Sequence, residues 1–245
     1  MSSYYNENDP FAAAWLRELI KAGLIADGEV DERCITEVAT DDVRGFTQCH
    51  WFAGIGGWSC ALRLARWPDD RPVWTGSCPC QPFSSASNRH NKRADDAKHL
   101  WPALSRLITT RTPKCVFGEQ IAQAGDWFGE VCADLENGGY EIGASIFPAV
   151  ALGYDHVRAR LYFVGHAHRD RESIVSGDGQ KMDRLPRRRR VATRVVQSHG
   201  LPSRMALLRG FGNAIIPACA AAFIEAYMSL DQPAGRAIAA RMEHK

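Results

Sequence analysis

The sequence lacks the features that mark membrane and secreted proteins. No apolar run approaches the ~20 residues that a membrane-spanning helix needs. The polar start Met1-Ser-Ser-Tyr-Tyr5 does not resemble a signal peptide. Eight cysteines in 245 residues are too few for a disulfide scaffold. We therefore expect a cytoplasmic protein with reduced thiols and no membrane partner.

The sequence also contains little that indicates a metal site. Cys78 and Cys80 are separated by a single residue, which is the wrong spacing for a zinc knuckle, and no second cysteine pair follows. His166 and His168 resemble a ligand pair, although histidines in loops more often bind no metal. The formal net charge of +2 is too small to name a partner. We expect no metal, and any argument for a nucleic acid depends on where the charges lie.

What the sequence does contain is an alternation of strand and helix patterns. Its 245 residues, 45% of them apolar, can form one sizeable core with a small appended lobe. Strands are predicted at residues 46–51, 72–75, 114–117, 140–147 and 160–165. Helices are predicted at residues 11–23, 59–67, 100–108, 126–137 and 214–230. This alternation indicates an α/β fold with a mostly parallel, doubly wound, Rossmann-like sheet and helices on both faces.

The same patterns divide the chain into four parts. Residues 1–45 are expected to form an N-terminal helical extension, and residues 46–165 are expected to form the α/β core. Residues 166–205 lose periodicity and accumulate arginine, which predicts a small basic lobe. Residues 206–245 return to the core through an apolar helix.

Two short blocks carry most of the chemical information. Phe52-Ala-Gly-Ile-Gly-Gly57 is a glycine turn of the kind that closes a strand onto a helix around a small cofactor, and by itself it is a weak signal. Pro79-Cys-Gln-Pro-Phe-Ser84 places Cys80 directly after a proline in a loop at a strand end. An exposed thiol in such a loop can act as a nucleophile, whereas a lone cysteine beside proline is more often inert.

With three further blocks, the sequence resembles the cytosine-5 DNA methyltransferase family. These blocks are Gly118-Glu-Gln-Ile121, Arg158-Ala-Arg-Leu-Tyr-Phe-Val-Gly165 and Gly212-Asn-Ala-Ile-Ile-Pro217. All five follow the family's order between Thr47 and Tyr227. The resemblance implies a monomeric enzyme of a bacterial or phage-infected cell. It would transfer a one-carbon group to carbon 5 of a cytosine flipped out of double-stranded DNA.

The resemblance assigns catalytic roles to four residues. The Cys80 thiolate would add to ring carbon 6 of cytosine and make carbon 5 nucleophilic. Glu119 would face ring nitrogen 3 and the exocyclic amine, where it would stabilise the developing charge. Arg158 and Arg160 would lie beside the base and its carbonyl oxygen. The competing interpretations are an ordinary surface acid for Glu119 and the solvated face of a strand for the two arginines.

The resemblance also assigns residues to the one-carbon donor and to DNA. The expected donor contacts are Phe52, Gly54, Gly56, Gly57, Trp58 and Asn213. The expected DNA contacts are Gln81, Ser84, Arg89, Lys92, Arg93, Arg187, Arg188, Arg189 and Arg190. Arginine and lysine crowded in this way suit phosphates and guanine edges, and the alternative is a solvated tail. So short a basic lobe predicts a very short target sequence or none.

The chain departs from the family between its first two blocks. Only 19 residues, Trp58 to Gly76, separate them, whereas one strand–helix–strand crossover takes ~30 residues. The family has two strand–helix units there, and they supply acids for the ribose and the adenine of S-adenosylmethionine. The sequence therefore predicts a truncated sheet without these strands, and Asp69 and Asp70 are uncertain substitutes for the missing acids.

The shortness of this interval leaves the identity of the one-carbon donor open. 5,10-Methylenetetrahydrofolate, which would give 5-hydroxymethylcytosine, is favoured slightly because both adenosine units are lost together. S-adenosylmethionine is the alternative if the N-terminal 45 residues rebuild the missing wall of the donor site. Acids are available there for that purpose, namely Asp31, Glu32, Glu37, Asp41 and Asp42.

Two other functions remain possible from the sequence. The first is a non-catalytic DNA-binding module on a decayed methyltransferase fold, although binding alone requires no thiolate. The second keeps the chemistry but acts on structured RNA, as the tRNA branch of the family does. The cysteine-loop signature of that branch is not visible in this sequence.

Overall fold

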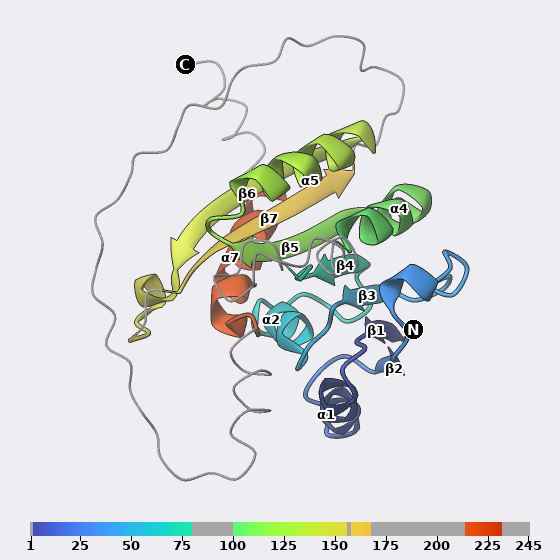
Figure 1. Ribbon diagram of the computed structural model, residues 1–245. Coiled ribbons are helices and arrows are strands. Elements are labelled where there is room, and N and C mark those ends of the chain that lie inside the picture. The colour runs from blue at the N-terminus through green and yellow to red at the C-terminus, as the bar shows by residue number, and fades with distance from the viewer. Residues whose placement is uncertain (1, 80–99, 156–157, 168–213, 232–245) are drawn as a thin grey trace, which may run out of the picture.

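A computed structural model of the chain describes residues 2–79, 100–155, 158–167 and 214–231. Within these residues one seven-stranded sheet has the order β2-β1-β3-β4-β5-β7-β6 (Figure 1). Its strands are β1 (Ser3–Asn6), β2 (Gly28–Asp31), β3 (Gln48–Trp51), β4 (Val73–Gly76), β5 (Cys115–Ile121), β6 (Tyr140–Pro148) and β7 (Ala159–Ala167). The first five strands are parallel, and β7 lies antiparallel between β5 and β6. The mostly parallel α/β sheet predicted from the sequence is confirmed.

Helices cover both faces of the sheet. They are α1 (Pro10–Lys21), α2 (Gly57–Leu64), α4 (Trp101–Arg111), α5 (Gly125–Asn137) and α7 (Pro217–Asp231), with short 3₁₀ helices η1 (Ile35–Glu37) and η2 (Ala149–Leu152). Successive strand residues point to opposite faces. Val116 therefore packs with α4 and α5, whereas Phe117 packs with α2 and α7. Tyr5 packs with Leu16 of α1 on the same side as α2.

The N-terminal residues build part of the sheet, so the expectation of a purely helical extension over residues 1–45 is wrong. Strand β1 lies between β3 and β2 and pairs with both, Tyr5 being opposite His50 on one side and Val30 on the other (Figure 1). Helix α1 connects the two strands and begins at Asp9, whose carboxylate accepts hydrogen bonds from the N–H groups of Phe11 and Ala12. Two parallel strands therefore flank the glycine-turn strand, and the prediction of a truncated sheet without them is also wrong.

Strand β1 is buried on both faces although two of its four residues are polar. The Asn6 amide donates to the carbonyl oxygens of Asp31 and Arg33 at 3.3 and 2.9 Å. The Tyr5 hydroxyl lies 2.6 Å from the Ala26 carbonyl oxygen and 3.0 Å from the Ser59 hydroxyl. Buried polar groups need such partners. The contacts join β1 to β2, α2 and the segment that leads into β2.

Neither a membrane span nor a metal cluster is found in the described part of the chain. Its helices are too short or too polar to cross a bilayer. Residues 2–79, 100–155, 158–167 and 214–231 contain no group of three or more His, Cys, Asp or Glu side chains arranged to hold an ion.

Candidate active site

The candidate site lies where neighbouring parallel strands end. Strand β3 runs into the glycine turn, β4 runs into Ser77 and Cys78, and Glu119 lies near the end of β5. The carboxyl ends of adjacent parallel strands share one edge of the sheet, which is where open α/β sheets bind ligands. The three sequence blocks are therefore brought together by strand pairing.

The glycine turn has the backbone conformation that its sequence predicts. Gly54 and Gly56 have φ angles of 54° and 83°, in the left-handed region that favours glycine. Gly56 is the N-cap of α2, and a side chain there would press against Leu16 and Leu19 of α1. Phe52 also has a positive φ of 51°, which is uncommon for a residue with a side chain.

Two predicted donor residues have other neighbours in the structure. A Cβ atom on Gly57 would lie 2.8 Å from Ile215, so this glycine allows α2 to pack against the segment that leads into α7. Trp58 is only 3% exposed, stacks on Phe117 and donates its indole N–H to the Ser77 hydroxyl at 3.0 Å. Trp58 therefore lies in the core beneath the site and contacts the loop that leads to Cys80.

Glu7, which no motif of the sequence singles out, lies directly after β1. Its carboxylate accepts hydrogen bonds from the N–H of Gly54 at 2.7 Å and from the N–H of Asp9 at 2.9 Å. A negative charge is thereby held against the glycine turn by a neighbouring strand. The available signal was an acid next to the helix start Asp9-Pro10, but the sequence did not reveal that a strand precedes it.

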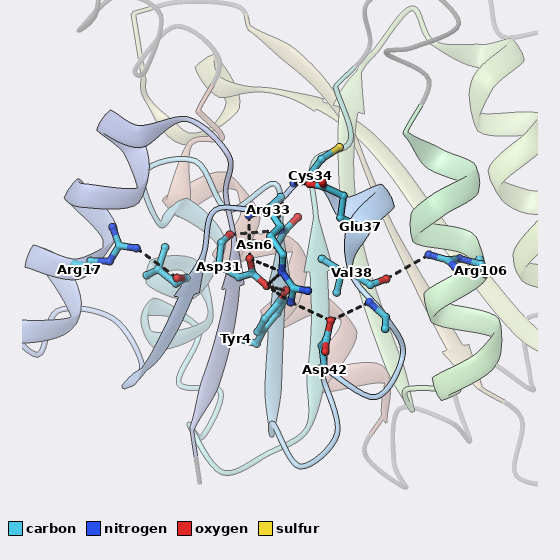
Figure 2. A network of polar contacts seen from close by, with 12 residues as sticks. Tyr4, Asn6, Arg17, Asp31, Arg33, Cys34, Glu37, Val38, Asp42 and Arg106 are labelled. Carbon is cyan, nitrogen blue, oxygen red and sulfur yellow. Dashed lines mark hydrogen bonds and ion pairs between the residues drawn. The ribbon is translucent and has the colours of Figure 1, made fainter.

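The five acids singled out in the N-terminal region have structural partners instead. Asp31 accepts from the Tyr4 hydroxyl at 2.7 Å, and Arg33 joins Asp31 to Asp42 with ion pairs of 2.6 and 2.9 Å (Figure 2). Burial opposes ionisation of Asp31, but the hydrogen bonds from Arg33 and Tyr4 outweigh it and lower the pKa of that carboxyl. This network fastens the edge strand β2 to the following loop.

Most of the remaining acids singled out in the sequence also have structural partners. Glu32 pairs with Arg17, Asp41 with Arg44, and the Glu37 carboxylate accepts from the backbone N–H of Cys34. Asp69, in the interval before β4, forms an ion pair with Arg63 of α2. Asp69 and Asp70 precede β4 and so lie at the opposite end of the sheet from the turn. They do not replace the acids that the interval lacks.

Glu119 is buried and ion-paired, which excludes an ordinary surface acid. Its Oε1 lies 2.9 Å from Nε of Arg160, with exposed side-chain fractions of 7% and 21%. Burial raises the pKa of Glu119, although Arg160, a hydrogen bond with Ser77 and the charge of Arg158 act in the opposite direction. The raised pKa favours a protonated carboxyl, which can donate a hydrogen bond.

Arg158 and Arg160 approach Glu119 from the β7 side. The guanidinium of Arg158 donates to the Ala214 carbonyl oxygen at 2.8 Å, which connects this strand to the start of α7. Burial and the like charge of Arg160 lower the pKa of Arg158. Both arginines are partly buried, so neither lies on a fully solvated face.

The segment before Cys80 is fastened to the end of β5. The Gln120 amide donates to the Cys78 carbonyl oxygen at 2.9 Å, and Ser77 shares a hydrogen bond with Glu119. The segment that leads to Cys80 is therefore held beside Glu119. Cys80 itself lies outside the described residues, as do Gln81, Ser84, Arg89, Lys92, Arg93, Arg187, Arg188, Arg189, Arg190 and Asn213.

The fold and the site define an α/β protein that carries a buried acid and two arginines beside a glycine turn. The sequence model of the C-5 cytosine-specific DNA methylases matches residues 66–200, more than half of the chain. The chain belongs to this family, as the sequence blocks predict. The matched region begins after the glycine turn, so β1, β2 and β3 lie outside it.

Several known proteins are similar to part of this chain. The type II methyltransferase M.NlaX of Neisseria lactamica is 25% identical over 147 residues, which are 57% of this chain and 46% of that protein. This chain thus spans about half the length of that curated relative. Solved structures overlap it at low identity. A Spodoptera frugiperda DNMT2 mutant has 11% identity and a TM-score of 0.46, with coverage of 70% of this chain and 46% of that chain. A putative DNA modification methyltransferase from an E. coli prophage has 14% identity and a TM-score of 0.40, with coverage of 68% and 47%.

Proposed function

We propose that the chain is a DNA cytosine-5 methyltransferase that uses S-adenosylmethionine and acts as a monomer on a cytosine flipped out of double-stranded DNA. The observation that carries this proposal is the position of Glu7 against the glycine turn. An acid at the end of the strand beside the glycine strand is what a ribose diol requires. The unit β1–α1–β2 supplies that acid from a part of the sequence that precedes the turn.

The presence of β1 and β2 beside β3 argues against a folate donor. 5,10-Methylenetetrahydrofolate was favoured only because the adenosine-binding strands were expected to be absent. Two parallel strands occupy the flank of β3, so the alternative in which the N-terminal residues rebuild the wall is the one that we adopt.

The residues at the turn fit S-adenosylmethionine. Gly54 and Gly56 bring bare backbone close to the cofactor position, and Glu7 offers carboxylate oxygens to the ribose hydroxyls. Phe52 and Asn213 remain expected contacts. When bound, S-adenosylmethionine supplies an electrophilic methyl group. The protein's own residues must bind it, orient it and hold the base opposite it.

At the base, Cys80 and Glu119 would divide the chemistry. The Cys80 thiolate forms a bond to ring carbon 6, and the electron pair of the ring double bond becomes available at carbon 5. Burial raises the pKa of Glu119, and in its protonated form this carboxyl would donate to ring nitrogen 3 and stabilise the charge that develops there. Methyl transfer to carbon 5 would release S-adenosylhomocysteine, after which carbon 5 would lose its proton to a base, the ring double bond would re-form and the thiolate would leave.

Glu119 also argues against a module that only binds DNA. A buried carboxyl with an arginine partner is costly to maintain. Binding to phosphates needs exposed cations and no buried acid. The cluster formed by Glu119, Arg158 and Arg160 is better explained by contact with a base.

The proposal is tested by covalent trapping on duplex DNA that contains 5-fluorocytosine. Fluorine at carbon 5 blocks the release of the enzyme, so an adduct resistant to denaturation should accumulate when S-adenosylmethionine is added. No adduct should form with 5,10-methylenetetrahydrofolate. Cys80→Ala should abolish the adduct, and mass spectrometry of normal DNA products should identify 5-methylcytosine.

The matched control is Cys78→Ala, which removes a buried thiol from the same loop. It should leave the adduct intact. An adduct that persists in Cys80→Ala would end the assignment of the nucleophile. A 5-hydroxymethylcytosine product with the folate would end the donor assignment.

A further inference from the structure

Trp58 connects the glycine turn to the surroundings of Glu119. It is the second residue of α2 and follows the glycine turn directly. Its ring is fixed between Phe117, stacked at a centroid distance of 6.1 Å, and Tyr162, edge-on at 6.4 Å. Its indole nitrogen lies 3.0 Å from the Ser77 hydroxyl oxygen. Ser77 follows Gly76, which pairs with Gly118 in the parallel register of β4 and β5, so Ser77 lies beside Glu119, and a hydrogen bond from Ser77 lowers the pKa of that carboxyl.

While Glu119 is ionised, the chemistry of these groups gives the chain of hydrogen bonds a single direction. An indole N–H can only donate, so the Ser77 oxygen must accept from Trp58. The Ser77 hydroxyl proton is then left for Glu119, whose carboxylate form can only accept. The order is therefore Trp58 to Ser77 to Glu119, and the tryptophan selects the rotation of the serine hydroxyl.

We propose that Trp58 and Ser77 are positioning residues for Glu119, with Trp58 aiming the Ser77 hydroxyl at the carboxyl group. The inference rests on the proposed function only in that Glu119 contacts the cytosine. Arg160 already holds Oε1 from the opposite strand. A donor from the β4 side would fix the plane of the carboxyl group and present its remaining face to the base.

Ser77 also connects Glu119 to the segment that leads to Cys80. Ser77 lies three residues before Cys80, and the next residue, Cys78, is held to β5 by Gln120. The acid and the segment leading to the thiol are therefore positioned by one another. Through Trp58, the start of α2 at the glycine turn is joined to Ser77 by a hydrogen bond.

Other groups also influence the ionisation of Glu119. From the β7 side these are Arg160 and Arg158, and Tyr162 and Cys219 of α7 in turn act on Arg158. A test must therefore isolate the serine and tryptophan contributions from these charges, all of which stay constant in the variants chosen below.

The experiment titrates the Glu119 carboxyl directly by ¹³C NMR of protein labelled at the glutamate carboxyl carbons. The Glu119 signal is assigned by its loss in Glu119→Gln. Ser77→Ala should raise the pKa of Glu119, because it removes a hydrogen bond that favours the charged form. Ser77→Thr keeps the hydroxyl and should restore the wild-type titration. Trp58→Phe removes the N–H while keeping an aromatic ring, and it should shift the titration in the same direction by a smaller amount.

The decisive comparison is the double variant. Because Trp58 acts through Ser77, Trp58→Phe should add nothing in the Ser77→Ala background. The matched control is Trp67→Phe. Trp67 also contacts Phe117, but its N–H donates to the Arg71 carbonyl oxygen at 3.0 Å. That control should leave the Glu119 titration unchanged, which separates positioning from a general loss of packing.

The inference is overturned if Ser77→Ala leaves the Glu119 titration where it is, or if Trp58→Phe acts equally with and without the Ser77 hydroxyl. In DNA methylation assays, activity that needs protonated Glu119 should persist to higher pH in Ser77→Ala than in the wild type. Should the NMR shifts appear while no variant and no wild-type protein forms 5-methylcytosine, the positioning stands and the proposed function fails.

Discussion

Two carboxylates in contrasting environments define the site at the residue scale. Glu7 is partly exposed and bonded to two backbone N–H groups at the glycine turn. Glu119 is buried and paired with Arg160, and burial raises the pKa of its carboxyl. The first environment suits an acceptor for ribose hydroxyls. The second suits a group that donates to a ring nitrogen.

Replacing Glu7 should weaken donor binding without a comparable effect on folding. Glu7→Gln keeps the size of the side chain but loses the charge and one acceptor oxygen. A hydrogen bond to a charged group contributes about 1.5–3 kcal/mol, so the Kd for S-adenosylmethionine should rise by about 10- to 100-fold in isothermal titration calorimetry. Glu32→Gln is the control, since Glu32 pairs with Arg17 at the surface. Equal affinity of Glu7→Gln and the wild type would remove Glu7 from the donor site.

At the scale of elements, the contact between β5 and β7 brings Arg160 to Glu119. Gly118 pairs with Phe163, and a Cβ atom on Gly118 would collide with the Phe163 ring. The absence of a side chain lets β7 bring Arg160 to the adjacent Glu119. The glycine is required by close approach rather than by an unusual backbone angle.

Two glycine substitutions should therefore have opposite effects on stability. Gly118→Ala should lower the free energy of unfolding by about 1–3 kcal/mol, because the aromatic ring must move in a packed core. Gly129→Ala places a methyl group in open space on α5, and it should raise that free energy by about 1 kcal/mol through helix propensity. Urea unfolding measures both. A neutral Gly118→Ala would contradict the close packing of β7.

At the scale of the whole molecule, buried polar side chains make stability depend on pH. His50 of β3 is 1% exposed, stacks on Tyr5 and lies 2.8 Å from the Thr75 hydroxyl. Burial lowers the pKa of His50 from 6.5 to about 3. The folded protein therefore holds this histidine neutral, whereas the unfolded chain protonates it at mildly acidic pH.

The free energy of unfolding should consequently decrease as the pH falls below the pKa of histidine in the unfolded chain. A depressed histidine pKa means that the unfolded chain binds more protons, so its stabilising contribution is present above pH 6.5 and is lost on acidification. The expected slope from His50 is about 1.4 kcal/mol per pH unit. Urea unfolding at a series of pH values should show a shallower slope for His50→Gln than for the wild type. Identical slopes would show that another group controls the acid limb.

The local features of this protein can be predicted from its sequence. Hydrophobic periodicity predicted most helices and the strands from β3 onward, and the five blocks predicted the family and the acid–arginine pair. These features depend on neighbouring residues and on side-chain chemistry, which a linear sequence records directly. Strand β1 was missed because its Ser-Tyr-Tyr-Asn stretch is short and half polar, and it is buried only through long-range partners.

Which strands lie beside the glycine turn depends on the tertiary fold. The interval between the first two blocks correctly excluded further strands there, but it could not show that β1 and β2 fill the same flank from an earlier part of the chain. Strand pairing is a contact between residues far apart in sequence, so spacing does not reveal it. The same is true of Glu7 and of the Trp58–Ser77 contact. Their meaning appears only once separate strand ends and the start of α2 converge at one edge of the sheet.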